Sequence, residues 1–335
     1  MKAEHNSRFF ARRAVRIFRD LQKMRIYGII STVSPLLRQN AKAVNDKRGK
    51  NMNALKHNRA MSFITVLLIY ILAAAVGVLS YRALPFVWWL SLLIADALAT
   101  VLTFLFSLLF GNASVYDPYW SVQPPVILFA FAFGKELNAL GVLLLITVLF
   151  WAVRLTANWA YTFGDLSHQD WRYTMLKEKT GALYPAVNFV GIHMVPTLVV
   201  YACVLPAVFA IRTSVAFRAP CLIFICISLF AAIMQTISDI QMHKYRKNRD
   251  AAFNRHGLWK YSRHPNYLGE ILMWWGVSLA VACAAPHAWY LLFGAAANTA
   301  LFFFVSIPLA EGRQAKKEGF AAYKSETRML LPIAK

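Results

Sequence analysis

Long apolar stretches separated by short polar segments dominate the chain from residue 62 onward. They cover residues 62–79, 86–110, 119–134, 137–154, 189–211, 219–238, 269–285 and 288–309. A helix needs about 20 mostly apolar residues to cross a bilayer, and most of these stretches approach that length. Residues 119–134 form the shortest stretch and hold Pro124 and Pro125, so we expect a broken or tilted span there. The pattern predicts an all-α polytopic membrane bundle of about eight transmembrane helices.

The composition supports this prediction by excluding other classes of protein. Of the 335 residues, 59% are hydrophobic and 15% are charged, whereas soluble domains average about 45–50% and about 25%. These values argue against a cytosolic globular protein, a disordered chain and a disulfide-rich scaffold. The four cysteines lie inside apolar stretches without metal-ligand spacing, so we expect buried small side chains and no metal site.

Positive charge is concentrated in a few segments. Lys and Arg number 36 against 15 Asp and Glu, and residues 1–60 carry 15 of these basic side chains. Eight spans place both termini on one side of the membrane. If that side is the cytoplasm, the outer loops keep only Arg82, Lys135, Arg212 and Arg218, as the positive-inside rule requires. We therefore expect an integral membrane protein with both termini cytoplasmic, in a bacterial inner membrane or the endoplasmic reticulum, that binds no nucleic acid.

Residues 1–60 are expected to form a basic amphipathic arm. Apolar side chains recur at helical spacing from Phe10 to Met24, and arginines fill the opposite face. This pattern predicts a helix lying on the anionic lipids of the inner leaflet, and an organelle transit peptide is the alternative interpretation. We divide the rest of the chain into two first transmembrane helices (61–110) and a larger membrane domain (111–335).

The most informative segment runs from Gly257 to Glu270, at the inner mouth of the seventh expected span. Its notable side chains are Arg263, His264, Asn266, Tyr267 and Glu270. A positive-inside anchor with interfacial aromatic residues would explain the basic and aromatic positions. It would not explain Asn266 and Glu270, because an amide and an acid at the start of an apolar helix are costly unless they bind something or cap the helix. We therefore expect this segment to bind a ligand.

Three further groups of polar residues are expected on the same inner side of the membrane as residues 257–270. Asp239, His243 and Arg246 share one helical face, which suits either a structural ion pair or a nucleotide. The other two groups are centred on Asn158 with the Asp170–Tyr173 segment, and on Glu311, Arg313 and Tyr323. By topology the four inner segments converge on one basic and aromatic surface, which suits a ligand with phosphates and flat rings.

The run Arg-His-Pro-Asn-Tyr-Leu-Gly-Glu at residues 263–270, after Gly-Leu-Trp at 257–259, resembles the C-terminal domain of the steroid 5-alpha-reductase superfamily. The Asn-Trp, Asp-Trp-Arg-Tyr and Asp-x-Gln motifs at 158, 170 and 239 occur in the same order, so the resemblance extends over residues 116–332. It implies a seven-span core with one extra N-terminal span. It also implies NADPH as cofactor, held by residues that match the family motifs or flank them on the inner face: Asn158, Asp239, Arg246, Arg263, His264, Asn266, Tyr267, Glu270, Arg313 and Tyr323.

The resemblance implies reduction of an enone-type double bond in a lipophilic, steroid-like substrate. The family uses a Glu and a Tyr to polarise the carbonyl oxygen, and this sequence lacks a clear copy of that pair. Asp117 and Tyr119 are the best substitutes, although Asp117 would also serve as a helix N-cap. Asp96 lies in mid-span outside the resembling region, where it is either functional or an interhelical hydrogen-bond partner. An S-adenosylmethionine-dependent methyltransferase of the isoprenylcysteine type, or a non-catalytic lipid-binding relative, are the alternative functions.

Overall fold

The computed structural model describes residues 49, 52–248 and 251–332. The chain divides into two units, Met1–Asn58 and Arg59–Lys335. The predicted amphipathic helix at residues 10–24 lies outside the described residues, so that prediction stays open.

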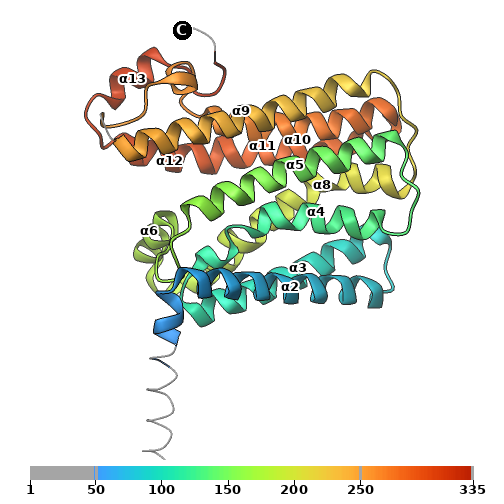
Figure 1. Cartoon of the computed structure of the whole chain (residues 1–335), viewed down its shortest axis with the longest axis horizontal. Helices are drawn as coiled ribbons and strands as arrows, with labels where there is room; N and C mark the ends of the chain where they lie inside the picture. Colours follow the sequence, from blue (N-terminus) through green and yellow to red (C-terminus); the bar gives the residue numbers. More distant parts are fainter. Residues whose placement is uncertain (1–48, 50–51, 249–250, 333–335) are drawn as a thin grey trace, which may run out of the picture. The chain divides into compact units, whose positions relative to one another are not determined.

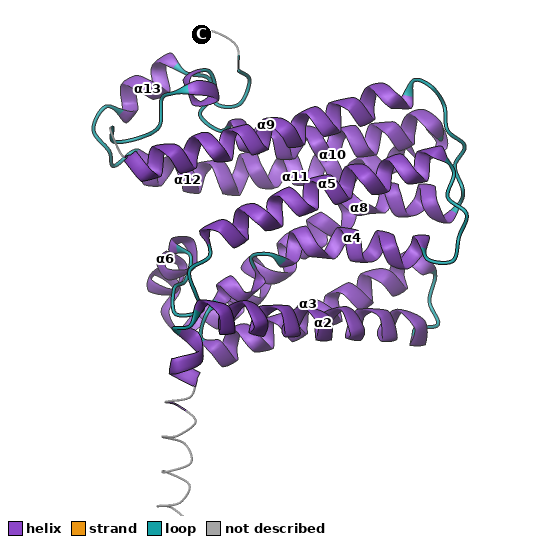
Figure 2. Ribbon diagram, in the orientation of Figure 1, coloured by secondary structure: helices purple, strands orange, loops and turns teal. Residues whose placement is uncertain are grey.

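The second unit is a bundle of helices that run back and forth between two ends (Figure 1). The first half comprises α2 (Arg59–Ala83), α3 (Trp88–Phe110), η1 (Ala113–Tyr116), α4 (Tyr119–Ala132), α5 (Ala139–Thr162), α6 (Trp171–Thr180) and η2 (Gly181–Leu183). The second half comprises α7 (Tyr184–Val187), η3 (Asn188–Met194), α8 (Val195–Arg212), α9 (Cys221–Asn248), η4 (Gly257–Lys260), α10 (Pro265–Ala284), η5 (Pro286–Leu292), α11 (Phe293–Leu301), η6 (Phe302–Ser306), α12 (Ile307–Gln314) and α13 (Phe320–Glu326). The described residues contain no named β-strand, which confirms the all-α prediction (Figure 2).

Within the described part of the chain, seven helices are long and apolar enough to cross a membrane. The eighth expected span is α4, whose 14 residues rise only about 21 Å at 1.5 Å each. This helix is short but not broken, because it continues through Pro124 and Pro125. The two prolines lack N–H groups, so the carbonyls four residues earlier, on Trp120 and Ser121, lose their helical donors.

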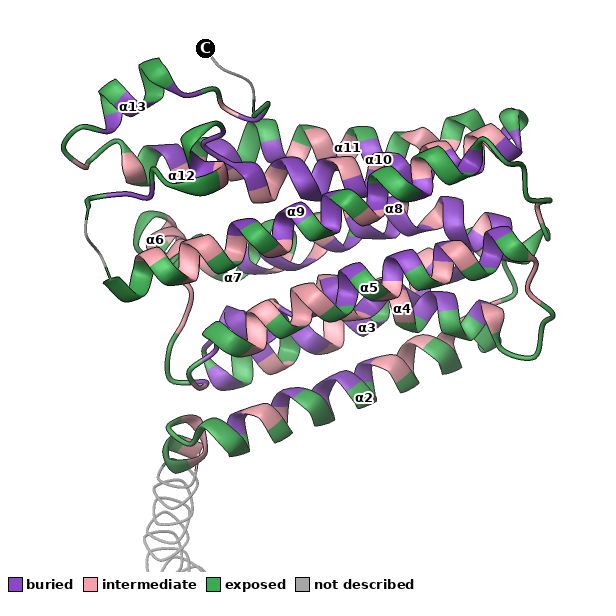
Figure 3. Ribbon diagram, turned by 45° about the horizontal axis from the view of Figure 1, so that its top comes forward, coloured by how far each residue is buried: buried purple, intermediate pink, exposed green. Residues whose placement is uncertain are grey.

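Apolar side chains cover the outside of the bundle as well as its core. Leu67 and Leu68 of α2 are each 60% exposed, and Phe304 of η6 is 81% exposed. Exposed residues form stripes along the outer faces of the long helices (Figure 3). An outer surface of this kind is stable against lipid and not against water, as expected of an integral membrane protein.

Helices α9 and α10 pack at very short range because glycines face the partner helix. A Cβ added at Gly269 would lie 2.8 Å from the Ala231 carbonyl oxygen, and one at Gly276 would lie 2.6 Å from the Phe224 carbonyl oxygen. This packing brings the polar side chains of α9 directly against the first turns of α10.

The loops at residues 84–87, 133–138 and 213–220 lie at one end of the bundle, and α6, α12 and α13 lie at the other (Figure 1). We call the second end the polar end. The segment that follows α12 folds back onto η4, since Arg263 N–H donates to the Arg328 carbonyl at 3.0 Å. Tyr323 is buried there against Phe253, with its hydroxyl donating to the Trp259 carbonyl.

Candidate functional site

Glu270 lies in a fully enclosed hydrogen-bond cage inside the bundle. Its Oε2 accepts from Trp151 Nε1 at 2.8 Å and from Gln235 Nε2 at 2.6 Å. Its Oε1 accepts from Trp274 Nε1 at 2.9 Å, and the residue is only 6% exposed. Because α5, α9 and α10 each supply a donor, the carboxyl joins three helices. Three donors on one buried carboxyl compensate its lost hydration.

Arg154 extends this network toward the polar end. One of its nitrogens donates to Gln235 Oε1, and the other forms an ion pair with Asp239 Oδ2, both at 2.6 Å. One turn further along α9, His243 Nε2 is 2.7 Å from Asn158 Oδ1. The structure therefore pairs Asp239 with Arg154 and His243 with Asn158, whereas Arg246 is exposed at the end of α9.

A second cluster surrounds Glu311 of α12. Its carboxylate accepts from Arg263 Nε at 2.8 Å, lies 3.3 Å from His264 Nε2 and pairs with Lys324 Nζ at 2.7 Å. Arg263 also donates to the carbonyls of Lys324 and Thr327. Arg263 and His264 are thus held by protein groups, and together they tie the start of α10 to the C-terminal segment.

Asn266 and Tyr267 differ from these neighbours because both residues are only partly buried. The Oδ1 atom of Asn266 is buried, and the described residues offer it no hydrogen-bond partner. Tyr267 stacks in parallel on His264, with ring centroids 5.2 Å apart and an interplanar angle of 5°. The half-buried amide and the stacked ring lie at the first turn of α10, on the polar end.

Helix α6 connects the α10–α12 region with the start of α4. The Arg313 guanidinium lies 4.4 Å from the centre of the Trp171 ring. On the other side of α6, the Tyr173 hydroxyl donates to Asp117 Oδ1 at 2.6 Å. Asp170, the N-cap of α6, accepts from the Arg172 N–H. Burial alone would raise the pKa of Asp170, but its bonds with Arg172 hold the pKa below its ordinary value.

Asp117 is half-buried between η1 and α4. Burial raises its pKa to about 6, against the lowering effect of Arg172 and of the Tyr173 hydrogen bond. The residue at the N-cap position of α4 is Pro118, without a side-chain cap bond. The structure therefore places Asp117 against α6 instead of at the N-cap, and it does not bring Asp117 and Tyr119 together.

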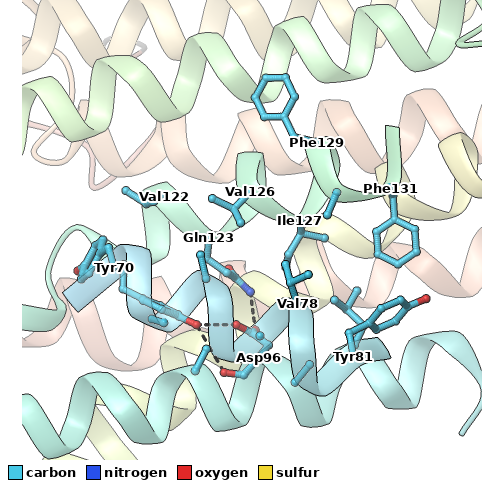
Figure 4. Close-up of a pocket in the computed structure, with 18 of the residues that line it drawn as sticks. Tyr70, Val78, Tyr81, Asp96, Val122, Gln123, Val126, Ile127, Phe129 and Phe131 are labelled. Carbon is cyan, nitrogen blue, oxygen red and sulfur yellow. Dashed lines mark hydrogen bonds between the residues drawn. The ribbon is translucent and has the colours of Figure 1, made fainter. Parts of the chain in front are cut away.

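Tyr119 instead contacts Asp96, the mid-span acid of α3. Its hydroxyl donates to Asp96 Oδ1 at 2.8 Å, and Gln123 Nε2 donates to Asp96 Oδ2. Figure 4 shows Gln123 and Asp96 pointing toward each other. These three residues, the Asp96 triad, line a cavity of about 480 Å³ between α2, α3 and α4, whose other walls are mostly apolar. A cavity of this size accommodates a small lipophilic molecule.

Further hydroxyls surround the triad on its inner side. Tyr116 stacks on Tyr119 with ring centroids 5.2 Å apart, and its hydroxyl lies 2.7 Å from Thr197 Oγ1. Thr197 in turn lies 2.9 Å from Thr100 Oγ1. His193, in the π-helical turn η3, packs against the Tyr116 ring. Such π-turns are frequent at functional sites.

Several of these partners were not singled out from the sequence. Gln123, Trp151, Arg154 and Gln235 each occupy an apolar stretch, where a polar side chain requires a buried partner. That cost is the signal that would have identified them. The pairing itself depends on which helices are neighbours, and spacing along the chain does not reveal it.

The fold and these buried networks define a polytopic α-helical membrane protein with polar clusters inside its bundle. Residues 103–327 match the family described as a protein of unknown function, DUF1295. Since that match covers more than half of the 335 residues, the chain belongs to this family. The chain is 27% identical to the uncharacterized protein C594.04c of Schizosaccharomyces pombe over 234 residues, which cover 61% of this chain and 67% of the relative. No solved structure shows a significant match.

Proposed function

We propose that this protein is an NADPH-dependent membrane oxidoreductase that reduces an enone-type double bond of a lipophilic substrate. The observation that carries the proposal is the Tyr119–Asp96 pair at the wall of an apolar cavity. A phenol backed by a carboxyl in an apolar site is suited to polarise a carbonyl oxygen and supply a proton. The resemblance of residues 263–270 to steroid 5-alpha-reductases agrees with this chemistry.

In the proposed reaction, Tyr119 donates its proton to the carbonyl oxygen of the substrate. Asp96, protonated in the reactive state, then returns a proton to the Tyr119 oxygen across the 2.8 Å hydrogen bond. The resulting enol becomes the saturated ketone by gaining a proton at its α-carbon and losing the one on its oxygen. The apolar walls exclude water and strengthen the hydrogen bonds to the substrate. When bound, NADPH would supply the hydride for the β-carbon.

Some of the residues expected to bind NADPH are available for contact with it, and others are already held by protein partners. Asn266 has an unpartnered buried oxygen, Tyr267 presents a stacked ring, and Arg246 and Arg313 are exposed at the polar end. We assign these four to cofactor contact. Their neighbours with internal partners act as supports: Asn158, Asp239, Arg263, His264, Glu270 and Tyr323. Asp117 is assigned to holding α6 next to α4.

We further propose that the polar end faces the cytoplasm, where NADPH is available, and that the N-terminal arm binds anionic lipid. The proposed membrane is a bacterial inner membrane or the endoplasmic reticulum. This orientation follows from the distribution of Lys and Arg along the sequence and the positive-inside rule.

A ligand screen on the purified full-length protein in detergent tests the function. We expect NADPH to raise the thermal unfolding temperature and S-adenosylhomocysteine to leave it unchanged. Asn266→Ala and Arg246→Ala should each weaken NADPH binding about tenfold, the loss of one good polar contact. Arg218→Ala, an exposed arginine at the opposite end, is the matched control. Stabilisation by S-adenosylhomocysteine instead would select the methyltransferase, and no stabilisation by either would favour a non-catalytic protein.

A further inference from the structure

The cavity at the Asp96 triad opens sideways, toward the surroundings of the bundle. Its rim includes Val78 of α2 together with Phe129 and Phe133 of the α4 region, and these side chains are 37%, 48% and 89% exposed. Small residues of α2, among them Ala73 and Gly77, leave room along the inner wall. A molecule therefore reaches the triad from the lipid phase, between α2 and α4, without passing through the polar end.

The hydrogen-bonding capacity at the inner wall is unbalanced. Tyr119 and Gln123 both direct donors at the Asp96 carboxyl. The Oε1 atom of Gln123 is buried, and it has no hydrogen-bond partner among the described residues. The carboxyl oxygens of Asp96 also keep acceptor capacity beyond the two hydrogen bonds that they receive. The triad thus offers surplus acceptors, and a buried acceptor without a partner is unfavourable.

We infer that the cavity binds a lipid whose polar end carries a hydroxyl group, with that hydroxyl donating to the Asp96 triad. The apolar body of the lipid fills the space between α2 and α4. A hydrocarbon or an ether would leave the acceptors unpaired, so the cavity distinguishes an alcohol from its methyl ether.

This inference rests on the proposed function for the identity of the cavity as the substrate site. It adds that the substrate carries a hydroxyl close to the carbonyl that Tyr119 polarises. The α2 wall and Asp96 both precede residue 103, where the family match begins. The specificity is therefore assigned to the first two helices of this chain and to α4 together.

Binding of matched lipids to the full-length protein in nanodiscs tests the inference. The probes are tritiated geranylgeraniol, competed with unlabelled geranylgeraniol or its methyl ether, in the absence of NADPH. We expect the alcohol to bind at least about tenfold more tightly than the ether, the value of one hydrogen bond to a buried acceptor. Gln123→Leu should reduce that ratio to about threefold or less. Asp96→Asn, which replaces an acceptor by a donor, should abolish the ratio.

Gln314→Leu is the matched control, since Gln314 of α12 also has a buried Oε1 without a partner in the described chain and does not line the cavity. It should keep the wild-type ratio. Equal affinity for alcohol and ether in the wild type, or a ratio unchanged in both triad variants, would overturn the inference. Thermal stabilisation by NADPH, measured on the same preparations, reports on the proposed function separately. An alcohol preference without that stabilisation would leave the lipid site standing and remove the reductase.

Discussion

Arg154 of α5 and Asp239 of α9 form an ion pair across 85 residues of sequence, with Nη2 and Oδ2 2.6 Å apart. Their side chains are only 8% and 16% exposed. Arg154 also holds Gln235, which in turn donates to Glu270. The ion pair therefore fixes the position of α9 relative to α5 beside the proposed cofactor surface.

Breaking this pair from one side should be costly. Arg154→Met leaves a buried carboxylate without its partner, and we expect the free energy of unfolding to fall by about 3 kcal/mol. Arg154→Met combined with Asp239→Leu should recover more than half of that loss, because no unpaired charge remains. Reversible unfolding in mixed micelles measures both values. The exposed pair Arg255–Glu326 is the control, with side chains 47% and 60% exposed, and its removal should cost less than about 1 kcal/mol.

Glu270 should contribute to the stability of the folded protein. Glu270→Gln places an amide nitrogen among three N–H donors, and we expect a loss of about 2 kcal/mol. Glu318→Gln, on an exposed position, should change the stability by less than about 0.5 kcal/mol. The unfolding temperatures of the two variants in the same detergent provide the comparison. Equal values would show that the cage around Glu270 contributes nothing.

The close packing of α9 and α10 predicts opposite effects for two Gly→Ala substitutions. At Gly276 the new Cβ would lie 2.1 Å from Ser228 Oγ and 2.6 Å from the Phe224 carbonyl oxygen, so the helices must separate at a cost of at least about 2 kcal/mol. At Gly312, inside α12, nothing lies within 4 Å, and alanine should stabilise the helix by about 0.5–1 kcal/mol. Thermal unfolding of both variants gives the signs. Destabilisation by both would contradict the close packing of α9 and α10.

The raised pKa of Asp117 predicts that the stability of the protein depends on pH. Its pKa of about 6 in the folded protein lies above the ordinary value of 3.8, so the folded state binds the proton more tightly. Its contribution is therefore most favourable below about pH 4 and is lost as the pH rises through 6, by up to about 3 kcal/mol. Asp117→Asn removes this slope and keeps an oxygen that accepts from Tyr173.

The measurement is the difference in unfolding temperature between wild type and Asp117→Asn at pH 4.5, 5.5 and 7. The wild type should lose stability relative to the variant as the pH rises. Asp165 is the control, because hydrogen bonds from Ser167 and His168 lower its pKa to about 2. Asp165→Asn should therefore differ from the wild type by a nearly constant amount over the same range. A constant difference for Asp117→Asn as well would contradict the prediction.

The sequence by itself determined the class of fold. Apolar stretches of near-membrane length allow few structures other than a helical bundle, since backbone groups in lipid must be satisfied within each helix. It also located the polar segment from Arg263 to Glu270 at the mouth of a span, where α10 begins at Pro265. An amide and an acid are costly at the start of an apolar helix, and this cost can be recognised from the residues themselves.

The tertiary structure decided which polar side chains meet. Tyr119 forms its hydrogen bond with Asp96 and not with Asp117. Asp239 forms its ion pair with Arg154 and not with Arg246. Arg263 and His264 both contact Glu311 of α12. Each of these partners lies on a different helix, and a buried charge selects whichever partner the packing of the apolar faces brings within hydrogen-bond distance. The apolar faces of the helices are similar in composition, so the sequence does not reveal which helices are neighbours. The polar pairs can therefore be identified only in the folded bundle.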